Sequence, residues 1–169
     1  MATMYLAFTT AGIETLKRHV NDRPVNMLVA YPLLKTFMRE RKNFNVQKWI
    51  MDSGAFSVAN SGKTINIYEY MTACRSVDAA EVIALDDLNS WAISKRNTEL
   101  MLAAGIPAMP VYHHGEPIEY LDWCCQNAEK IGLGSKIKTK PLWLKSTMDH
   151  IWKNFGPTKV HGFGMAERK

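Results

Sequence analysis

The chain contains 169 residues, of which 47% are hydrophobic and 22% are charged, and it includes five tryptophans. A chain this apolar can bury a core, so its composition excludes a disordered, collagenous or disulfide-stapled protein. Because domains usually contain roughly 100–200 residues, we predict a single domain over residues 1–169.

The charged residues divide the chain into three stretches. Basic side chains outnumber acidic ones by 8 to 3 in residues 1–50 and by 8 to 2 in residues 136–169, whereas residues 51–135 carry 5 basic and 11 acidic side chains. Basic flanks around an acidic middle indicate a carboxylate-lined site with a rim that faces a polyanion. An ordinary solvated surface gives the same pattern, so charge alone leaves both interpretations open.

The sequence carries no sign of membrane insertion or metal binding. No apolar run approaches the roughly 20 residues that a transmembrane helix needs, and the first ten residues lack the basic segment that opens a signal peptide. The three cysteines, Cys74, Cys124 and Cys125, have no metal-ligand spacing, so we expect reduced thiols. We therefore expect a cytoplasmic protein with no membrane partner, no metal and no cofactor.

Short apolar runs alternate with helical patterns, which is typical of a parallel α/β protein. In chain order, the patterns predict a strand at 4–8, a helix from Thr10 to about Val20, a strand at 26–31, a helix beginning at Pro32, a strand at 48–51, a helix at 66–77, a strand at 81–85, a helix at 90–104, a strand at 107–112, a helix at 117–129, a strand at 130–133, a helix at 141–155 and a strand at 159–162. The prediction is thus seven strands with six helical connections.

Polar residues and glycines fall at the carboxyl ends of five consecutive predicted strands. They are Asp52 after the third strand, Asp86 and Asp87 after the fourth, His113 and His114 after the fifth, Gly132 and Gly134 after the sixth, and His161, Gly162 and Gly164 after the seventh. In a parallel α/β barrel the carboxyl ends of all strands converge on one face, where such folds build their sites. We therefore predict a TIM-barrel-like (β/α) barrel, shortened to about seven strands, with its site at this face.

Each of these groups also has a structural interpretation when taken alone. In segment 52–57, a carboxylate followed by glycine lets the backbone approach a flat ligand, but an Asx turn or a helix cap has the same pattern. Asp86 and Asp87 can cap a helix, and a lone histidine is often structural. Taken together, strand-end carboxylates can hold each other's pKa values apart, as acid/base chemistry requires. Gly132 and Gly134 form no phosphate loop and leave room for a planar base.

Six segments carry a resemblance to a known family. They are WIMDSGAFSV, GKTINIYEYM, VIALDDL, RNTELMLAAGIPAMPVYHHGEP, KIGLGS and KVHGFGM. In order and spacing, over roughly residues 27–165, the chain resembles the tRNA-guanine transglycosylase superfamily, and most closely its phage and bacterial DpdA-type 7-deazaguanine DNA transglycosylases. The DSGAF segment with its neighbours is the most specific of these motifs.

The resemblance implies a base exchange at the anomeric carbon of a nucleotide, with DNA as the expected polymer and tRNA as the alternative. A carboxylate attacks C1′, guanine leaves with the help of a proton, and an incoming 7-deazaguanine attacks the covalent intermediate. The exchanged base must be flipped out of the stack or lie in a single strand. A phage-encoded protein acting in the host cytoplasm fits the same expectation.

The resemblance also implies a role for each matching position. Asp52 takes the general-base role of the family's DSG motif. Asp86 hydrogen-bonds the guanine edge, with Asp87 as the weaker candidate, and His113 contacts the base. The other positions implied to bind the base or line its pocket are Ser53, Gly54, Phe56, Gly132, Leu133, Gly134, His161 and Gly164. Lysines of the basic flanks would hold phosphates, namely Lys136, Lys138 and Lys140.

The family's covalent nucleophile is an aspartate on an eighth strand, and its tRNA-modifying members carry a Cys/His zinc site beyond that strand. The 169 residues contain no match to either, so we expect a shortened enzyme or the pocket-bearing part of a split one. A second polypeptide or self-association would complete the barrel, or Asp52 or Asp86 would act as the nucleophile. The alternatives are a protein that binds guanine, a 7-deazaguanine or DNA without chemistry, and an N-glycosidic bond hydrolase.

Overall fold

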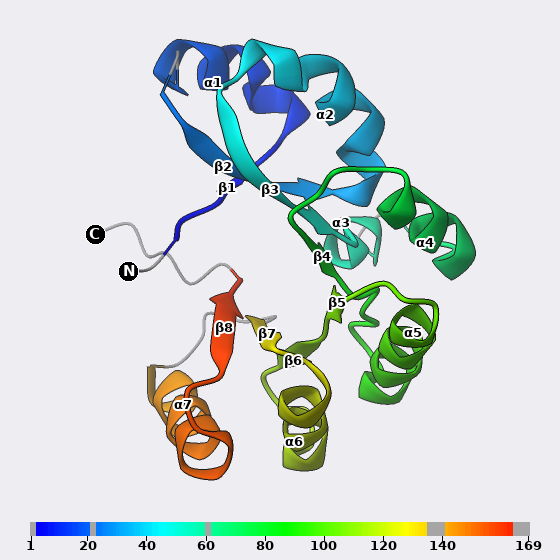
Figure 1. Ribbon diagram of the computed structural model, residues 1–169, viewed down its shortest axis with the longest axis vertical. Coiled ribbons are helices and arrows are strands. Elements are labelled where there is room, and N and C mark those ends of the chain that lie inside the picture. The colour runs from blue at the N-terminus through cyan, green and yellow to red at the C-terminus, as the bar shows by residue number, and fades with distance from the viewer. Residues whose placement is uncertain (1–2, 21–22, 60–61, 135–140, 164–169) are drawn as a thin grey trace. The chain divides into compact units, whose positions relative to one another are not determined.

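The structure is a computed structural model that describes residues 3–20, 23–59, 62–134 and 141–163. The chain forms two compact units, residues 1–85 and residues 86–169. Both units consist of parallel strands joined by helices, which confirms the predicted α/β class (Figure 1). The prediction of one domain over the whole chain stays a prediction.

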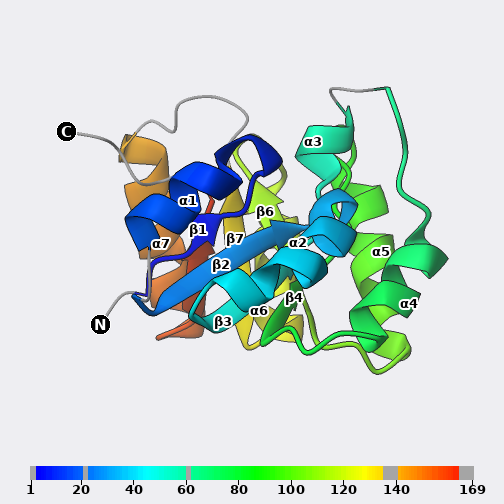
Figure 2. The ribbon, with the colours of Figure 1, turned by 90° about the horizontal axis from the view of Figure 1, so that it is seen from above.

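The first unit is built on the parallel strands β1 to β4, which lie side by side in chain order. The strands are β1 (Leu6–Ala7), β2 (Val25–Ala30), β3 (Val46–Asp52) and β4 (Glu81–Ile83). The helices are η1 (Thr10–Gly12), α1 (Ile13–Val20), η2 (Tyr31–Leu33), α2 (Leu34–Glu40), η3 (Arg41–Asn43), α3 (Ala55–Ala59) and α4 (Ile67–Arg75). Figure 2 shows β2 and β3 running beside each other, with α2 along them.

The core of the first unit is aromatic where α2 meets the sheet. Phe37 of α2 is fully buried, and its ring centroid lies 5.3 Å from that of Phe8 and 5.0 Å from that of Trp49. Tyr70 of α4 is also fully buried, and its hydroxyl donates a hydrogen bond of 2.7 Å to the Ile83 carbonyl. Consecutive residues of β3 are buried, as expected for a parallel strand that is covered on both faces. These contacts fix the helices against the strands.

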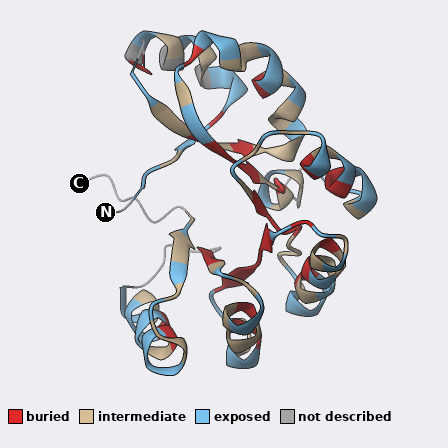
Figure 3. Ribbon diagram, in the orientation of Figure 1, coloured by how far each residue is buried: buried red, intermediate tan, exposed pale blue. Residues whose placement is uncertain are grey.

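The second unit contains the parallel sheet β6-β7-β8. Its strands are β5 (Ala108–Met109), β6 (Val111–His113), β7 (Lys130–Gly134) and β8 (Lys159–Gly162), and its helices are α5 (Trp91–Ala103), α6 (Ile118–Asn127) and α7 (Pro141–Phe155). In β7, burial is nearly continuous, because four of its five residues are buried. Figure 3 shows burial concentrated on the strands, with exposed residues on the outer faces of the helices.

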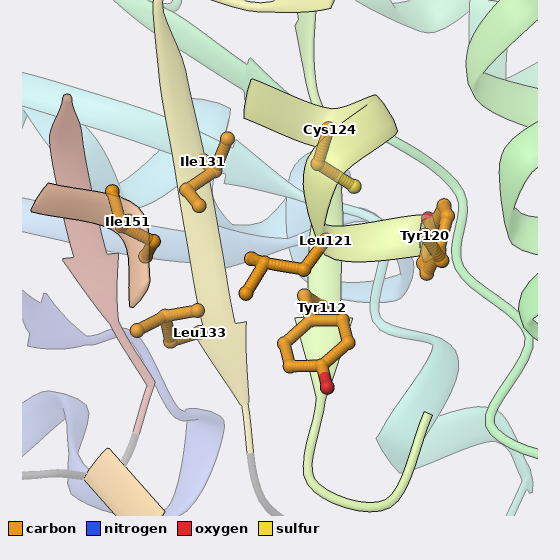
Figure 4. Close-up of a cluster of buried hydrophobic side chains, with 7 residues drawn as sticks. All are labelled: Tyr112, Tyr120, Leu121, Cys124, Ile131, Leu133 and Ile151. Atoms are coloured by element: carbon orange, nitrogen blue, oxygen red, sulfur yellow. The ribbon is translucent and has the colours of Figure 1, made fainter. Parts of the chain in front are cut away.

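One face of the β6-β7-β8 sheet packs against α6 and α7 to form a hydrophobic core (Figure 4). Its members are Tyr112, Tyr120, Leu121, Cys124, Ile131, Leu133 and Ile151. Successive side chains of a strand point to opposite faces. Because Tyr112 and Leu133 face this core, the residues next to them in sequence, His113, Gly132 and Gly134, belong to the opposite face of the sheet. On that face Gly134 is the register partner of His113.

The predicted elements are found in the predicted order, with three differences. The single strand predicted at 107–112 is two strands, because Pro110 has no N–H to donate and interrupts the ladder. The described part of the chain therefore has eight strands rather than seven. The helix predicted from Thr10 opens with the short 3-10 turn η1 before α1, and α3 was not predicted. Among the described residues, no helix has the length and apolarity to cross a membrane.

Candidate functional site

Three polar side chains of the second unit form a largely buried group, here called the strand-end cluster: Asp86, His113 and Glu116. His113 is the last residue of β6, and Glu116 follows three residues later, before α6. The Nε2 atom of His113 lies 3.4 Å from Asp86 Oδ2, and its Nδ1 atom lies 3.6 Å from Glu116 Oε1. The side chains are 9 to 12% exposed, so the ring stands between two carboxylates that are largely shielded from water.

A tight turn fixes Glu116 in this position. Its carboxylate oxygen Oε2 accepts a hydrogen bond of 2.6 Å from the His113 N–H, and its own N–H donates to the His113 carbonyl at 3.1 Å. The Tyr112 hydroxyl donates to the Glu116 carbonyl at 2.8 Å. Gly115 has a φ of 93°, which other residues rarely adopt. The sequence HHGE therefore folds back on itself and brings the carboxylate to the imidazole.

Glu116 was not among the predicted site residues. Its signal in the sequence is a carboxylate three residues after a strand-end histidine, with a glycine between them that permits the turn. His113 was predicted, and the structure buries it, whereas its neighbour His114 is exposed and lies edge-on to Trp143 at 5.1 Å. His113, the last residue of β6, is therefore buried, whereas His114, which follows the strand, lies on the surface.

The imidazole of His113 fits against the neighbouring strand only because that strand carries glycine. A Cβ atom at Gly134 would lie 2.7 Å from His113 Cδ2 and 2.9 Å from Nε2, and a Cβ at Gly132 would lie 2.6 Å from Phe163 Cε2. Real Cβ contacts are essentially never this short. The sequence suggested that these glycines leave room for a planar base. In the structure the space beside them is taken by the chain's own rings.

The polar atoms of the cluster are not all hydrogen-bonded. Nδ1 of His113 is buried and has no hydrogen-bond partner, because the 3.6 Å separation from Glu116 exceeds hydrogen-bond length. A buried polar atom without a partner costs about 1–3 kcal/mol, and such atoms often mark functional positions. An imidazole that faces a carboxylate on each side can hold a proton on either nitrogen. The cluster is therefore suited to proton transfer.

The other predicted residues of the second unit have structural surroundings. The Asp87 carboxylate accepts a hydrogen bond of 2.8 Å from the Asn89 N–H, which is an Asx turn leading into α5. Leu133 is fully buried in the core, and its carbonyl accepts from the Phe163 N–H at 2.9 Å. His161 on β8 packs edge-on against the ring of Phe163, with the centroids 4.6 Å apart. The strand-end cluster does not include these residues.

The DSGAF segment belongs to the first unit and joins β3 to α3. Asp52 ends β3 opposite Ala30. Ser53 is fully buried, and its Oγ accepts a hydrogen bond of 3.3 Å from the Ala55 N–H, which is a serine turn leading into α3. Gly54 has a φ of 77°. Phe56 is 61% exposed.

Four predicted positions lie outside the described residues: Lys136, Lys138, Lys140 and Gly164. Their proposed contacts with phosphate or base stay predictions. No group of three or more His, Cys, Asp or Glu side chains suited to a metal ion occurs in the part of the chain that the structure describes.

The cysteines do not provide a nucleophile. All three thiols are free, and burial raises the pKa of Cys74 and of Cys125 to about 11 and raises that of Cys124 as well. A thiol with such a pKa stays protonated near neutral pH, and only the thiolate is strongly nucleophilic. The three thiols are therefore not candidates for the nucleophile.

Comparison with known proteins gives no relative: no protein-family model, no curated protein and no solved structure matches this chain.

Proposed function

We propose that this protein exchanges guanine in nucleic acid, with DNA as the favoured polymer, for a 7-deazaguanine derivative. The observation that carries the proposal is the strand-end cluster, in which the shielded Asp86 carboxylate lies 3.4 Å from the His113 imidazole. The order and spacing of the DSGAF, VIALDDL and KIGLGS segments also support it. The proposal covers a shortened enzyme and the pocket-bearing part of a split one, and it includes a shortened TIM-like barrel as the overall arrangement.

Asp86 suits the recognition of guanine for a chemical reason. The Watson–Crick edge of guanine carries two adjacent donors, N1–H and N2–H, and an ionised carboxylate accepts hydrogen bonds on both of its oxygens. Hydrogen bonds to a charged group contribute about 1.5–3 kcal/mol, more than neutral ones. A carboxylate that is only 10% exposed faces little competition from water for these donors.

The proposed reaction proceeds in two balanced halves. A carboxylate oxygen attacks C1′, the C1′–N9 bond breaks, and its electron pair leaves with guanine, which takes up one proton. The N9 atom of the incoming base then attacks C1′, the carboxylate leaves, and the incoming base loses its N9 proton. The attacking carboxylate is Asp52 or Asp86 in a shortened enzyme, or comes from a second chain in a split one. Where Asp52 is not the attacking carboxylate, it acts as the general base.

The test is incorporation of labelled guanine or a labelled 7-deazaguanine into DNA by the full chain. We expect incorporation by the wild type, its loss in Asp52→Asn, and at least a tenfold loss in Asp86→Asn, because about 1.4 kcal/mol corresponds to a factor of ten. Glu119→Gln, which makes the same kind of change on an exposed position of α6, serves as the control. Retained incorporation in Asp52→Asn contradicts the role of that residue.

Two other outcomes would replace the proposed activity. Guanine that raises the melting temperature, without any incorporation or protein–DNA adduct, identifies a binding protein. Release of free guanine from DNA in the absence of a second base identifies an N-glycosidic bond hydrolase that uses water as the acceptor. Trapping a covalent adduct with DNA excludes the binding protein.

A further inference from the structure

We infer that His113 carries a proton from the first half of the reaction to the second, and that Glu116 is the residue that positions its imidazole. The inference rests on the proposed base exchange and adds two roles to the same site. It starts from the contacts of the imidazole, whose two nitrogens face two different carboxylates.

The proton balance of base exchange calls for a group that works in both directions. The departing guanine takes up one proton, and the incoming base gives up one proton at the same place. One side chain that donates in the first half and accepts in the second, directly or through one bound water, closes this balance. In this scheme His113 performs the general-base step and Asp52 attacks C1′. A neutral imidazole has one nitrogen that donates and one that accepts a hydrogen bond, which suits it to both steps.

The contacts of Glu116 determine which nitrogen is available for this transfer. Its Oε2 is held by the His113 N–H at 2.6 Å, and this places Oε1 3.6 Å from Nδ1. A carboxylate is an acceptor only. Glu116 is fixed by this turn, whereas the Asp86 carboxylate is assigned to the donors of the nucleobase, so Nδ1 keeps its proton toward Glu116. Nε2 is then the nitrogen that exchanges a proton. It faces Asp86, the carboxylate that we propose to bind the edge of the guanine.

The ring is confined as a positioned catalytic group requires. The His113 side chain is 9% exposed, and a Cβ atom at Gly134 would lie 2.7 Å from its Cδ2 and 2.9 Å from its Nε2, so β7 has no room for a larger residue beside the ring. The separations of 3.4 and 3.6 Å are longer than hydrogen bonds. Catalytic hydrogen bonds are commonly this long before substrate binds, and they shorten in the complex. Losing the partner that orients a metal-bound histidine through its second nitrogen costs about 10–100-fold in activity, and we expect the same order for His113.

The first measurement is the protonation of the His113 ring nitrogens by ¹⁵N NMR of the full chain, with His113→Gln assigning the signals among the five histidines. We expect Nδ1 to be protonated at neutral pH in the wild type. In Glu116→Gln, the side-chain amide can donate toward Nδ1, and we expect the proton to move to Nε2. Glu119→Gln, on an exposed position, should leave the signals unchanged. An unprotonated Nδ1 in the wild type overturns the positioning role.

The second measurement is exchange of labelled guanine into DNA under saturating guanine. We expect Glu116→Gln to lower kcat by about 10–100-fold with little change in KM, and His113→Gln to lower kcat by about 100-fold or more. Glu116→Asp, which keeps a carboxylate, should recover part of the loss and retain the Nδ1 proton. This variant also guards against misfolding of Glu116→Gln.

The two readouts separate the failure of the inference from the failure of the proposed function. Exchange by the wild type that is unaffected by Glu116→Gln, with an unchanged ring signal, overturns the inference and leaves base exchange standing. A wild type that exchanges no guanine overturns base exchange and the proton-carrying role together. The NMR signal then decides only whether Glu116 holds the ring.

Discussion

Gly54 in the DSGAF segment is held by two independent constraints. Its φ of 77° lies in the left-handed region, and a Cβ atom at this position would lie 2.6 Å from Cδ of Pro32. The first constraint concerns the backbone of the residue itself. The second comes from η2, a different element, whose proline ring closes against the turn. Glycine is therefore required here for the fold, whatever ligand the segment binds.

We expect Gly54→Ala to lower the free energy of unfolding by about 2–5 kcal/mol, because left-handed strain of about 1–2 kcal/mol adds to an overpacking cost of about 1–3 kcal/mol. Gly62→Ala is the matched control, since Gly62 has a similar φ of 67° but no atom of the described residues within 4 Å of its Cβ position. It should lose only the strain. Urea unfolding followed by tryptophan fluorescence measures the loss of stability in both variants. Equal losses would mean that the Pro32 ring moves aside at no measurable cost.

The sequence could predict the site residues that a local pattern marks, but not the contacts that depend on backbone conformation or on strand register. Asp86 and His113 were predicted because each follows an apolar strand, a pattern that local sequence shows directly. The pairing of Glu116 with His113 depends on the positive φ of Gly115 and on the closure of the turn. The ring contacts at Gly132 and Gly134 depend on the register of β6 and β7, which no local pattern specifies.

The elements whose ends are marked by proline and glycine were predicted best. α7 begins at Pro141 and ends at Phe155, directly before Gly156 with a φ of 72°, and both ends were predicted. The predicted strand at 107–112 contains the same kind of marker in its interior, Pro110, which divides it into β5 and β6. α3 was missed because five residues are too few to show a helical period.

An ion pair ties η3 to the loop before β4 in the first unit. Arg41 donates to both carboxylate oxygens of Asp78, at 2.6 and 2.7 Å, and the indole N–H of Trp49 donates to the same carboxylate at 3.3 Å. These residues line a shallow cleft together with Lys42 and Lys48. The hydrogen bonds from Arg41 hold the pKa of Asp78 at about 2, below its ordinary value of 3.8.

We expect Asp78→Asn to destabilise the protein at pH 7 by less than about 1 kcal/mol, because the carboxylate is largely exposed and screened. Since the folded-state pKa is lowered, the ion pair stabilises fully above about pH 4, and this contribution is lost as the pH falls toward 2. The difference between wild type and variant should therefore shrink over this window. Urea unfolding at several pH values measures it, and Arg41→Gln with the double variant isolates the pair.

The division of the whole chain was not predictable from local patterns. The two compact units meet in sequence between Leu85 and Asp86, at the end of a predicted strand rather than in a linker. Periodicity reports which residues form a helix or strand, but the grouping of elements into a unit depends on contacts between distant residues.

The charge distribution is likewise a property of the whole chain, and it leads to a prediction about nucleic acid.

Phosphate contacts from lysine make DNA binding depend on salt, with a slope of log K against log salt of about −0.9 for each contact on duplex DNA. If Lys136, Lys138 and Lys140 hold phosphates, replacing all three by glutamine should reduce the magnitude of this slope by about 2–3. Fluorescence anisotropy with a labelled duplex between 50 and 200 mM salt measures it.

The control for this triple variant removes the same charge from the acidic middle of the chain, by changing Lys63, Lys95 and Lys130 to glutamine. Net charge falls equally in both variants, so a general loss of attraction between protein and DNA reduces the two slopes alike. Local phosphate contacts reduce only the first. Equal slopes in the two variants would therefore contradict a phosphate-binding role for residues 136–140, while leaving the base site around Asp86 untouched.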